Sequence, residues 1–225
     1  MSAVEKGEDG HARLMDRAYR TQRHFYDITR RYYLLGRDRL IEGLQPSPGM
    51  NVLEVGCGTG RNLVLAARRY PEAAFFGMDI SREMLATAHR AARRAKVDVA
   101  FGFGDATRFN PYSAFGVSRF ERIYLSYTLS MIPDWQTTLA QAVCNLAPGG
   151  SLHIVDFGQQ ERLPRWFRAL LHGWLAKFHV SPRGDLERVL HAIAAKLGAE
   201  LAFRPLYRGY AWYAVLKLPV NQKKA

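Results

Sequence analysis

Short apolar runs alternate with longer amphipathic patterns along this chain from about residue 50 onward. The runs have the length and the β-branched or aromatic content of buried strands, and the segments between them repeat apolar residues at helical spacing. Such alternation is typical of βαβ units and predicts an α/β domain with a mostly parallel sheet. We expect strands at 51–55, 73–78, 97–102, 119–125, 150–156, 199–206 and 210–217, and helices at 60–69, 81–94, 134–146 and 184–197.

The last two expected strands are separated only by a turn around Tyr207, Arg208 and Gly209. Parallel neighbours need a long crossover connection, usually a helix, for which this turn has no room. The sheet is therefore expected to have seven strands, with the last strand antiparallel to its neighbour.

Two segments lie outside this alternation. Residues 10–45 contain one or two helical patterns with eight Arg and five aromatic residues, and they end before the helix-breaking sequence at 46–49. Residues 161–180 contain a further helical pattern with an apolar stripe. The expected organisation is an N-terminal helical cap at 1–45 and an α/β domain at 46–225 with a helical insertion at 159–182.

The insertion combines apolar and basic residues on one helix. A basic amphipathic helix of this kind suits a membrane interface, although the same stripe also suits packing against the sheet or the cap. The apolar residues are Trp166, Phe167, Leu170 and Trp174, and the basic residues are Arg162, Arg165, Arg168 and Lys177.

The chain has 225 residues with 32 Lys and Arg against 20 Asp and Glu, which gives a net charge of +12. A charge of this size favours an anionic partner, either nucleic acid or an anionic membrane face, although surplus Arg also serves solubility alone. No apolar stretch approaches the roughly 20 residues that cross a bilayer, and the N-terminus lacks the pattern of a secretory signal. Cys57 and Cys144 are too few for a disulfide framework or a zinc site. A cytoplasmic protein without a metal centre is therefore expected.

The strand expected at 51–55 runs into a glycine-rich turn, Gly56-Cys57-Gly58-Thr59-Gly60, and then into a helix. Glycines in such a turn let the backbone approach a nucleotide-like ligand closely. The spacing is Gly-x-Gly-x-Gly rather than the Gly-x-Gly-x-x-Gly of dinucleotide folds, and Glu54 stands just before it. An acidic residue there suits an ammonium group and disfavours phosphates, so the turn indicates a ligand without a pyrophosphate.

Two aspartates follow the next two expected strands. Asp79 ends the second strand, where a carboxylate can accept hydrogen bonds from ribose hydroxyls, and Ser81 is placed to cap the next helix. Asp105 follows the third strand and is placed to accept from an adenine amino group, with the backbone amide of Ala106 beside the ring. Simpler roles remain open, since aspartates also start helices and stabilise turns.

The glycine turn and the two aspartates together resemble the class I S-adenosylmethionine-dependent methyltransferases, whose motifs occur in the same order over residues 50–157. The resemblance implies a Rossmann-like fold and S-adenosylmethionine as the cofactor, with S-adenosylhomocysteine as its product. It also implies a substrate near the end of the fourth strand, where Ser126 and Tyr127 stand. The cofactor-binding residues expected on this basis are Glu54, Gly56, Cys57, Gly58, Gly60, Asp79, Ile80, Met84, Asp105, Ala106 and Ser126.

The acceptor is marked less clearly. Ser126-Tyr127-Thr128 stands where methyltransferases of nucleic-acid bases carry an Asn-Pro-Pro-Tyr type signature, so nucleic acid is disfavoured as the substrate. Residues 19–41 place arginines among aromatic residues. Arginines pair with carboxylates and aromatic faces attract quaternary ammonium groups, so this segment suits a zwitterionic head group. A capping helix with a packed aromatic face and a solvated basic face is the open alternative.

This segment and the glycine motif resemble the bacterial diacylglyceryl-homoserine N-methyltransferases of betaine-lipid synthesis. The resemblance implies three methylations of the homoserine amine of a diacylglycerol ether lipid. It makes Tyr26 and Tyr127 the candidate catalytic residues at the amine. The candidate substrate residues are Arg23, Arg30, Arg37, Tyr32, Tyr33, Tyr207 and Tyr210.

The partners expected from this resemblance are the amino lipid, an anionic membrane surface and the enzyme that supplies diacylglyceryl-homoserine. The protein would then work peripherally on the inner face of the membrane. Phosphatidylethanolamine or a quinone ring is an alternative acceptor with a hydrophobic body. An RNA-binding methyltransferase and a catalytically silent cofactor-binding protein are alternatives of other classes.

Overall fold

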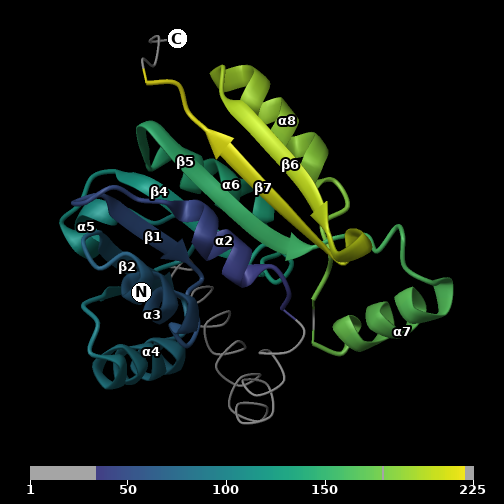
Figure 1. The fold of residues 1–225 in the computed structure, drawn as a ribbon, viewed down its shortest axis with the longest axis horizontal. Coiled ribbons are helices and arrows are strands. Elements are labelled where there is room, and N and C mark those ends of the chain that lie inside the picture. Colours follow the sequence, from purple (N-terminus) through teal and green to yellow (C-terminus); the bar gives the residue numbers. More distant parts are fainter. Residues whose placement is uncertain (1–33, 179, 221–225) are drawn as a thin grey trace, which may run out of the picture.

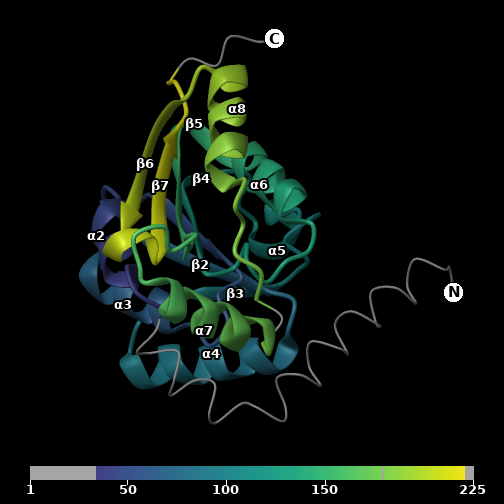
Figure 2. The same ribbon diagram turned by 90° about the vertical axis from the view of Figure 1, so that its right-hand side faces the viewer.

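A computed structural model describes residues 34–178 and 180–220 of the protein. One twisted sheet of seven strands forms its centre, with helices on both faces (Figures 1 and 2). The strand order is β3-β2-β1-β4-β5-β7-β6. The strands are β1 (Asn51–Val55), β2 (Ala74–Asp79), β3 (Ala100–Phe103), β4 (Phe120–Ser126), β5 (Leu146–Phe157), β6 (Glu200–Leu206) and β7 (Ala211–Lys217).

The direction of the strands agrees with the prediction. Strands β1 to β5 pair in parallel, and β7 runs antiparallel to both β5 and β6. A short 3-10 turn, Tyr207–Gly209, joins β6 to β7 and leaves no room for a crossover. The expected α/β fold with a mostly parallel, seven-stranded sheet is therefore confirmed.

Two apolar clusters hold the helices on the sheet. One cluster lies between the sheet and the helices α5 (Pro111–Phe115), α6 (Trp135–Cys144) and α8 (Leu186–Leu197). The other lies under α2 (Arg37–Leu44), α3 (Arg61–Arg69), α4 (Arg82–Ala95) and α7 (Arg165–Ala176). Strand β1 is buried from Val52 to Val55 and lies between the two clusters, which explains its nearly continuous apolar sequence.

Three details of the expected elements need correction. Strand β3 begins at Ala100 instead of 97, because Lys96 takes a left-handed conformation that ends α4 and leaves a short connection before the strand. Strand β5 begins at Leu146 instead of 150, because Leu146 already pairs with Phe120 across an irregular register. Helix α5 was not expected, although Asn110 caps it and Pro111 opens it in the usual way.

A helix, α7, forms within the segment expected at 159–182, and it lies apart from the other helices in Figure 1. That this segment is an insertion in the domain stays a prediction. The boundary between an N-terminal cap and the α/β domain stays a prediction, since residues 1–33 lie outside the described residues. Within the described residues, the helices are too short and too polar to span a bilayer.

Strand β1 lies between β2 and β4, so the chain leaves β1 for one side of the sheet and later returns on the other side. Ligands of doubly wound α/β folds bind at such a switch point, outside the carboxyl ends of the strands. The connections after β1, β2, β3 and β4 meet there, and most of the predicted cofactor residues stand in these connections or at the strand ends just before them.

Candidate functional site

A cavity of about 610 Å³ opens at the carboxyl ends of the parallel strands. It joins the glycine turn after β1 with the segments that follow β2, β3 and β4, and with the start of α2. Ten of the eleven predicted cofactor residues line it, namely Glu54, Gly56, Cys57, Gly58, Asp79, Ile80, Met84, Asp105, Ala106 and Ser126.

The glycine turn is held against β2 by backbone hydrogen bonds. The amides of Gly56 and Cys57 both donate to the carbonyl oxygen of Met78, at 2.8 and 2.9 Å. Gly56 has a φ of 72°, and a Cβ atom there would lie 2.5 Å from the methyl carbon of Thr128. The turn after β1 therefore depends on glycine for both its conformation and its contact with the segment after β4.

Gly60, the eleventh predicted residue, does not line the cavity. It begins α3 with a φ of 74°, and a Cβ atom there would lie 2.8 Å from the Cβ atom of Ala88 in α4. Gly60 therefore allows α3 to pack closely against α4 beside the cavity.

Glu54 is a buried carboxyl group in the cavity wall. Its Oε1 atom accepts a hydrogen bond from the Asn62 side-chain amide at 2.8 Å, and its Oε2 atom accepts one from the Tyr124 hydroxyl at 3.2 Å. Burial is the main cause that raises the pKa of Glu54 to about 8, against the lowering effect of these two hydrogen bonds. Both hydrogen-bond partners are neutral. A cation bound in the cavity would therefore stabilise the charged form of the Glu54 carboxyl group.

Two buried acceptor atoms in the cavity residues lack a hydrogen-bond partner within the described part of the chain. They are Oδ1 of Asn62, next to Glu54, and Oγ of Ser126, at the end of β4. A buried polar atom without a partner is costly, and a bound ligand with donor groups removes that cost. The pair Glu54 and Asn62 fits an ammonium group, as the amino-acid part of S-adenosylmethionine requires.

Asp79 supports the glycine turn and also borders the cavity. Its Oδ2 atom accepts from the Gly58 amide at 2.8 Å, and its Oδ1 atom accepts from the Ser81 amide at 2.9 Å. Ser81 in turn caps α4 by accepting from the Met84 amide. Asp79 lines the cavity, and a carboxylate oxygen can accept two hydrogen bonds, so its position suits a partner of ribose hydroxyls.

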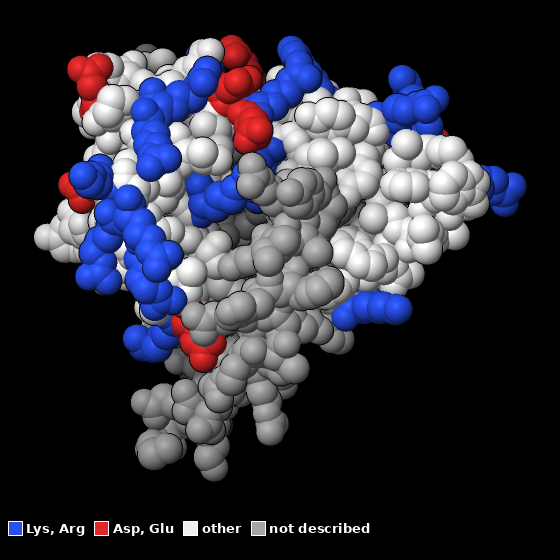
Figure 3. All heavy atoms as spheres, turned by 60° about the horizontal axis from the view of Figure 1, so that its bottom comes forward, with Lys and Arg blue, Asp and Glu red and all other residues white. Residues whose placement is uncertain are grey.

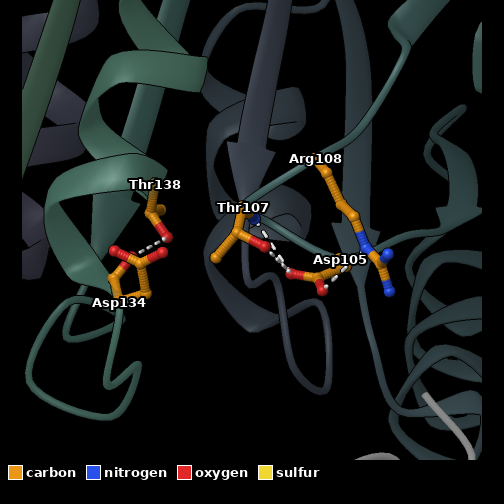
Figure 4. Close-up of polar contacts among 5 residues, drawn as sticks. All are labelled: Asp105, Thr107, Arg108, Asp134 and Thr138. Atoms are coloured by element: carbon orange, nitrogen blue, oxygen red, sulfur yellow. Dashed lines mark hydrogen bonds and ion pairs between the residues drawn. The ribbon is translucent and has the colours of Figure 1, made fainter. Parts of the chain in front are cut away.

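Asp105 forms a turn after β3 (Figure 4). Its Oδ1 atom accepts from both the amide and the hydroxyl of Thr107, at 2.9 and 2.8 Å, and its Oδ2 atom lies 3.5 Å from Nε of Arg108. The simpler role that the sequence left open, stabilisation of a turn, is therefore present in the structure. The same turn places Ala106 and Thr107 in the cavity wall, where an adenine ring is expected.

Tyr127 follows β4 directly and lines the cavity with an unusual backbone conformation, since its φ of 57° is rare for a residue other than glycine. Its ring packs edge-on against Phe157, with 4.7 Å between the centroids. Its hydroxyl donates to the carbonyl oxygen of Leu35 at 2.5 Å. Burial raises the pKa of Tyr127 well above the usual range, so this hydroxyl keeps its proton.

Arg37 is the one predicted substrate residue among the described residues that lines the cavity. It stands in the first turn of α2, and its Nε atom donates to the carbonyl oxygen of Leu34 at 3.1 Å. Against the raising effect of burial, the Arg37 guanidinium contributes to lowering the pKa of Glu54. Both residues line the cavity.

The other predicted substrate residues lie elsewhere. Tyr207 is half exposed and Tyr210 is buried against Phe157, and neither lines the cavity. Their assignment stays a prediction. The remaining candidates, Tyr26, Tyr32, Tyr33, Arg23 and Arg30, lie outside the described residues.

Several residues of the cavity wall were not expected from the sequence. Asn62 stands in the first turn of α3, where the helical pattern gave no sign of its hydrogen bond to Glu54. Asp134 caps α6 and lines the cavity, across from the Asp105 turn in Figure 4. An acidic residue just before an expected helix is the sequence signal that could have predicted it. The other unexpected residues are Leu34, Thr59, Arg61, Met78, Gly104, Thr107, Thr128, Met131, Ile132 and Pro133.

Residues 52–150 match the family described as "Methyltransferase domain". Among proteins of known function, nocamycin O-methyltransferase of Saccharothrix syringae is 32% identical over 57% of this chain and 45% of its own length. Trans-aconitate 2-methyltransferase of Delftia acidovorans is 35% identical over 53% of this chain and 43% of its own length. The chain therefore matches less than half the length of these two relatives.

Solved structures share the fold at low sequence identity. The YcgJ protein of Bacillus subtilis has a TM-score of 0.62 at 15% identity, over 82% of this chain and 98% of that one. Phosphoethanolamine N-methyltransferase 2 of Haemonchus contortus, solved with S-adenosylmethionine, has a TM-score of 0.63 at 18% identity, over 82% of this chain and 52% of that one. Two structures of the plantazolicin methyltransferase BpumL, solved with S-adenosylhomocysteine, have TM-scores of 0.65 and 0.66 at 14% identity, over 97% of this chain and 100% of that one.

The sheet order and the solved structures of the same fold show a Rossmann-like α/β fold of the kind found in class I methyltransferases. Residues 52–150 are similar to a methyltransferase domain, and the cavity at the switch point is lined largely by residues of this matched region. The match of residues 52–150 to a methyltransferase domain supports the prediction of S-adenosylmethionine as the cofactor.

Proposed function

We propose that the protein is an S-adenosylmethionine-dependent methyltransferase that methylates the homoserine amine of diacylglyceryl-homoserine and produces the trimethylated betaine lipid. The observation that carries this proposal is that one cavity contains both sides of such a site. Glu54 and Asp79 line it on the proposed cofactor side, and the guanidinium of Arg37 and the end of β4 adjoin them. The acceptor of such a cavity is expected to carry a carboxylate close to the group that is methylated.

The cofactor side follows from the hydrogen bonds already described. Glu54 and Asn62 would hold the ammonium of the methionine part, Asp79 the ribose, and the turn of Asp105 and Ala106 the adenine. When bound, S-adenosylmethionine supplies a methyl group on a sulfonium, which is reactive toward an amine without a metal or a strong base. The protein's part is then to position the acceptor and to exclude water from it.

Arg37 and Tyr127 shape the acceptor side. A guanidinium binds a carboxylate through paired, charge-assisted hydrogen bonds, so Arg37 would orient the homoserine carboxylate. Tyr127 keeps its proton and donates a hydrogen bond to the carbonyl oxygen of Leu35, so its ring suits a rigid wall of the site rather than a base. The acceptor nitrogen gives up a proton to solvent before the transfer, because only the neutral amine has the lone pair that accepts the methyl group.

A second candidate, methylation of a carboxylate on a small polyacid, has support from the relatives. Several of them are named trans-aconitate 2-methyltransferases, at 31 to 35% identity. The same arginine would suit a polyacid. The excess of positive charge and the exposed apolar residues of α7 favour the lipid acceptor over the small acid.

Transfer of a labelled methyl group tests the proposal directly. The protein is incubated with labelled S-adenosylmethionine and, in separate reactions, with diacylglyceryl-homoserine micelles, phosphatidylethanolamine, a demethylquinol, trans-aconitate and bulk RNA. We expect label in the homoserine lipid, with one, two and three methyl groups in succession. Label only in trans-aconitate would replace the proposal by the second candidate, and label only in another acceptor would refute both.

Arg37→Gln provides the matched variant for this assay. We expect it to raise the KM for the homoserine lipid by about tenfold or more, because a charge-assisted hydrogen bond contributes about 1.5 to 3 kcal/mol. The exposed Arg188→Gln, in α8, is the control for a change of one charge. Equal effects of the two variants would remove the support for a carboxylate site at Arg37.

A further inference from the structure

Helix α7 presents two apolar faces, of which only one packs against the protein. Leu171 and Leu175 are buried in the apolar cluster that also contains Tyr127. Trp166 and Leu170, one turn apart on the other face, are 70% and 67% exposed. An exposed Trp and Leu side by side on a helix are costly in water, and the pair indicates a surface that something apolar covers.

The exposed pair is surrounded by positive charge. From Arg162 to Gly184 the sequence contains no acidic residue, and Arg162, Arg165, Arg168 and Lys177 are all exposed. Within residues 34–178 and 180–220, none of these four side chains forms an ion pair with another described residue. Figure 3 shows the uncharged surface of this part of the molecule at the right, with blue basic groups at its edges.

The position of α7 links this surface to the cavity. The segment after the helix returns to the cavity wall, where the Ser181 amide donates to the carbonyl oxygen of Ser130. Arg183 then donates to the carbonyl oxygens of Leu129 and Ile132, at 3.0 and 2.7 Å. Met131 and Ile132 line the cavity. An external surface bound to α7 would therefore lie next to the site.

We propose that the exposed side of α7, with Trp166 and Leu170 and with the exposed Arg162, Arg165 and Arg168 of the same segment, docks the protein on an anionic lipid membrane. The Trp and Leu side chains enter the interface, and the arginines pair with anionic head groups. The face suits a membrane better than RNA, because RNA offers no apolar layer for the exposed Leu170. Docking requires neither cofactor nor acceptor, so it stands or falls separately from the proposed methyl acceptor.

Sedimentation with vesicles measures this docking. Vesicles of phosphatidylcholine are compared with vesicles of equal parts phosphatidylcholine and phosphatidylglycerol, without cofactor or acceptor. We expect binding only to the anionic vesicles. Arg165→Gln/Arg168→Gln should weaken it by about tenfold to thirtyfold, since each basic residue at the surface contributes about 1 kcal/mol. Trp166→Ala/Leu170→Ala should weaken it by a similar factor through the lost apolar area.

A matched pair of arginines separates docking by α7 from general attraction by the net charge. Arg93 and Arg94 are exposed in the last turn of α4, and Arg93→Gln/Arg94→Gln removes the same two charges elsewhere. We expect this control to retain most of the binding. Equal losses for the two arginine pairs would overturn the assignment to α7, even if the protein as a whole binds vesicles.

Trp fluorescence shows whether the helix enters the interface. Among the described Trp residues, Trp135 and Trp212 are buried and Trp174 is half-buried, so Trp166 is the exposed reporter. Brominated lipid in the anionic vesicles should quench the emission, and Trp166→Phe should remove most of that quenching while the protein still sediments. Quenching that is unchanged in Trp166→Phe contradicts the proposal. So does tight binding of poly(U) that the α7 variants weaken while vesicle binding is unchanged.

Discussion

The Tyr127 hydroxyl donates a hydrogen bond to the Leu35 carbonyl oxygen, across 92 positions of sequence, and so joins the end of β4 to the residue pair before α2. This contact brings the two sides of the proposed acceptor site together, because Tyr127 and Arg37 both line the cavity. The strained φ of Tyr127 is maintained by packing and by this hydrogen bond.

Tyr127→Phe removes that hydrogen bond and retains the ring. We expect a loss of about 1 kcal/mol in the free energy of unfolding, and a higher KM for the acceptor with little change in cofactor affinity. Urea denaturation and steady-state kinetics measure the two effects. Tyr112→Phe, at a side chain that is 66% exposed, is the control and should change neither. A weaker affinity for the cofactor with an unchanged KM for the acceptor would contradict this account, because it would place Tyr127 on the cofactor side of the cavity.

Glu54 makes the stability of the ligand-free protein depend on pH. Burial raises the pKa of Glu54 from 4.5 to about 8, so between these values the folded protein holds a proton that the unfolded chain has lost. Stability must therefore fall as the pH rises through this window. His153 acts in the opposite direction below pH 6.5, because burial lowers its pKa from 6.5 to about 3. The effect of Glu54 is thus clearest between pH 6.5 and 8.

Glu54→Gln should remove this dependence. We expect the unfolding free energy of the unaltered protein to fall by roughly 1 to 2 kcal/mol between pH 6.5 and 8, and that of Glu54→Gln to stay nearly level. Urea denaturation at several pH values measures it. The same slope in both proteins would show that other groups cause the pH dependence.

Asp79→Ala should weaken cofactor binding by about 1 to 3 kcal/mol, the range for polar groups that lose a buried partner. The variant removes the acceptor of the Gly58 amide and the proposed partner of the ribose. Asp98→Ala, at an exposed carboxyl group between α4 and β3, is the control. Calorimetric titration with S-adenosylhomocysteine compares the two, and an unchanged affinity in Asp79→Ala would refute the ribose assignment.

Gly60→Ala tests the contact between α3 and α4 beside the cavity. Gly60 and Gly116 have nearly the same φ, 74° and 70°, but an added Cβ meets Ala88 at Gly60 and nothing within 4 Å at Gly116. The backbone strain of the two substitutions is therefore equal. We expect Gly60→Ala to lower the unfolding free energy by about 1 to 3 kcal/mol more than Gly116→Ala, through overpacking. Equal losses in thermal or urea unfolding would show that Ala88 moves aside freely.

The cofactor half of the cavity could be predicted from the sequence because it follows local rules. Parallel strands end at one edge of the sheet, so the residues just after β1, β2 and β3 had to meet there. Glu54, Asp79 and Asp105 were found in this way. Gly60 was predicted to line the cavity with them, but it faces α4 instead. The glycine motif does not show which of its residues face the cavity and which face a neighbouring helix.

The hydrogen-bond partners of Glu54 could not be predicted, because they depend on how other elements pack beside it. The Tyr124 hydroxyl reaches Glu54 across 70 positions because β4 pairs with β1, and Asn62 reaches Glu54 from the first turns of α3. No periodic pattern marks such partners. Helix α7 shows the same limit, since its apolar stripe was visible in the sequence but the division into a buried and an exposed face required the structure.

Binding of S-adenosylhomocysteine to the unaltered protein, measured by calorimetric titration, tests the central claim most directly. The cavity of Glu54, Asn62 and Asp79 predicts one molecule bound per chain, with release of a bound proton as Glu54 becomes charged, so that the heat depends on the buffer. The absence of any heat with either S-adenosylhomocysteine or S-adenosylmethionine would contradict the account.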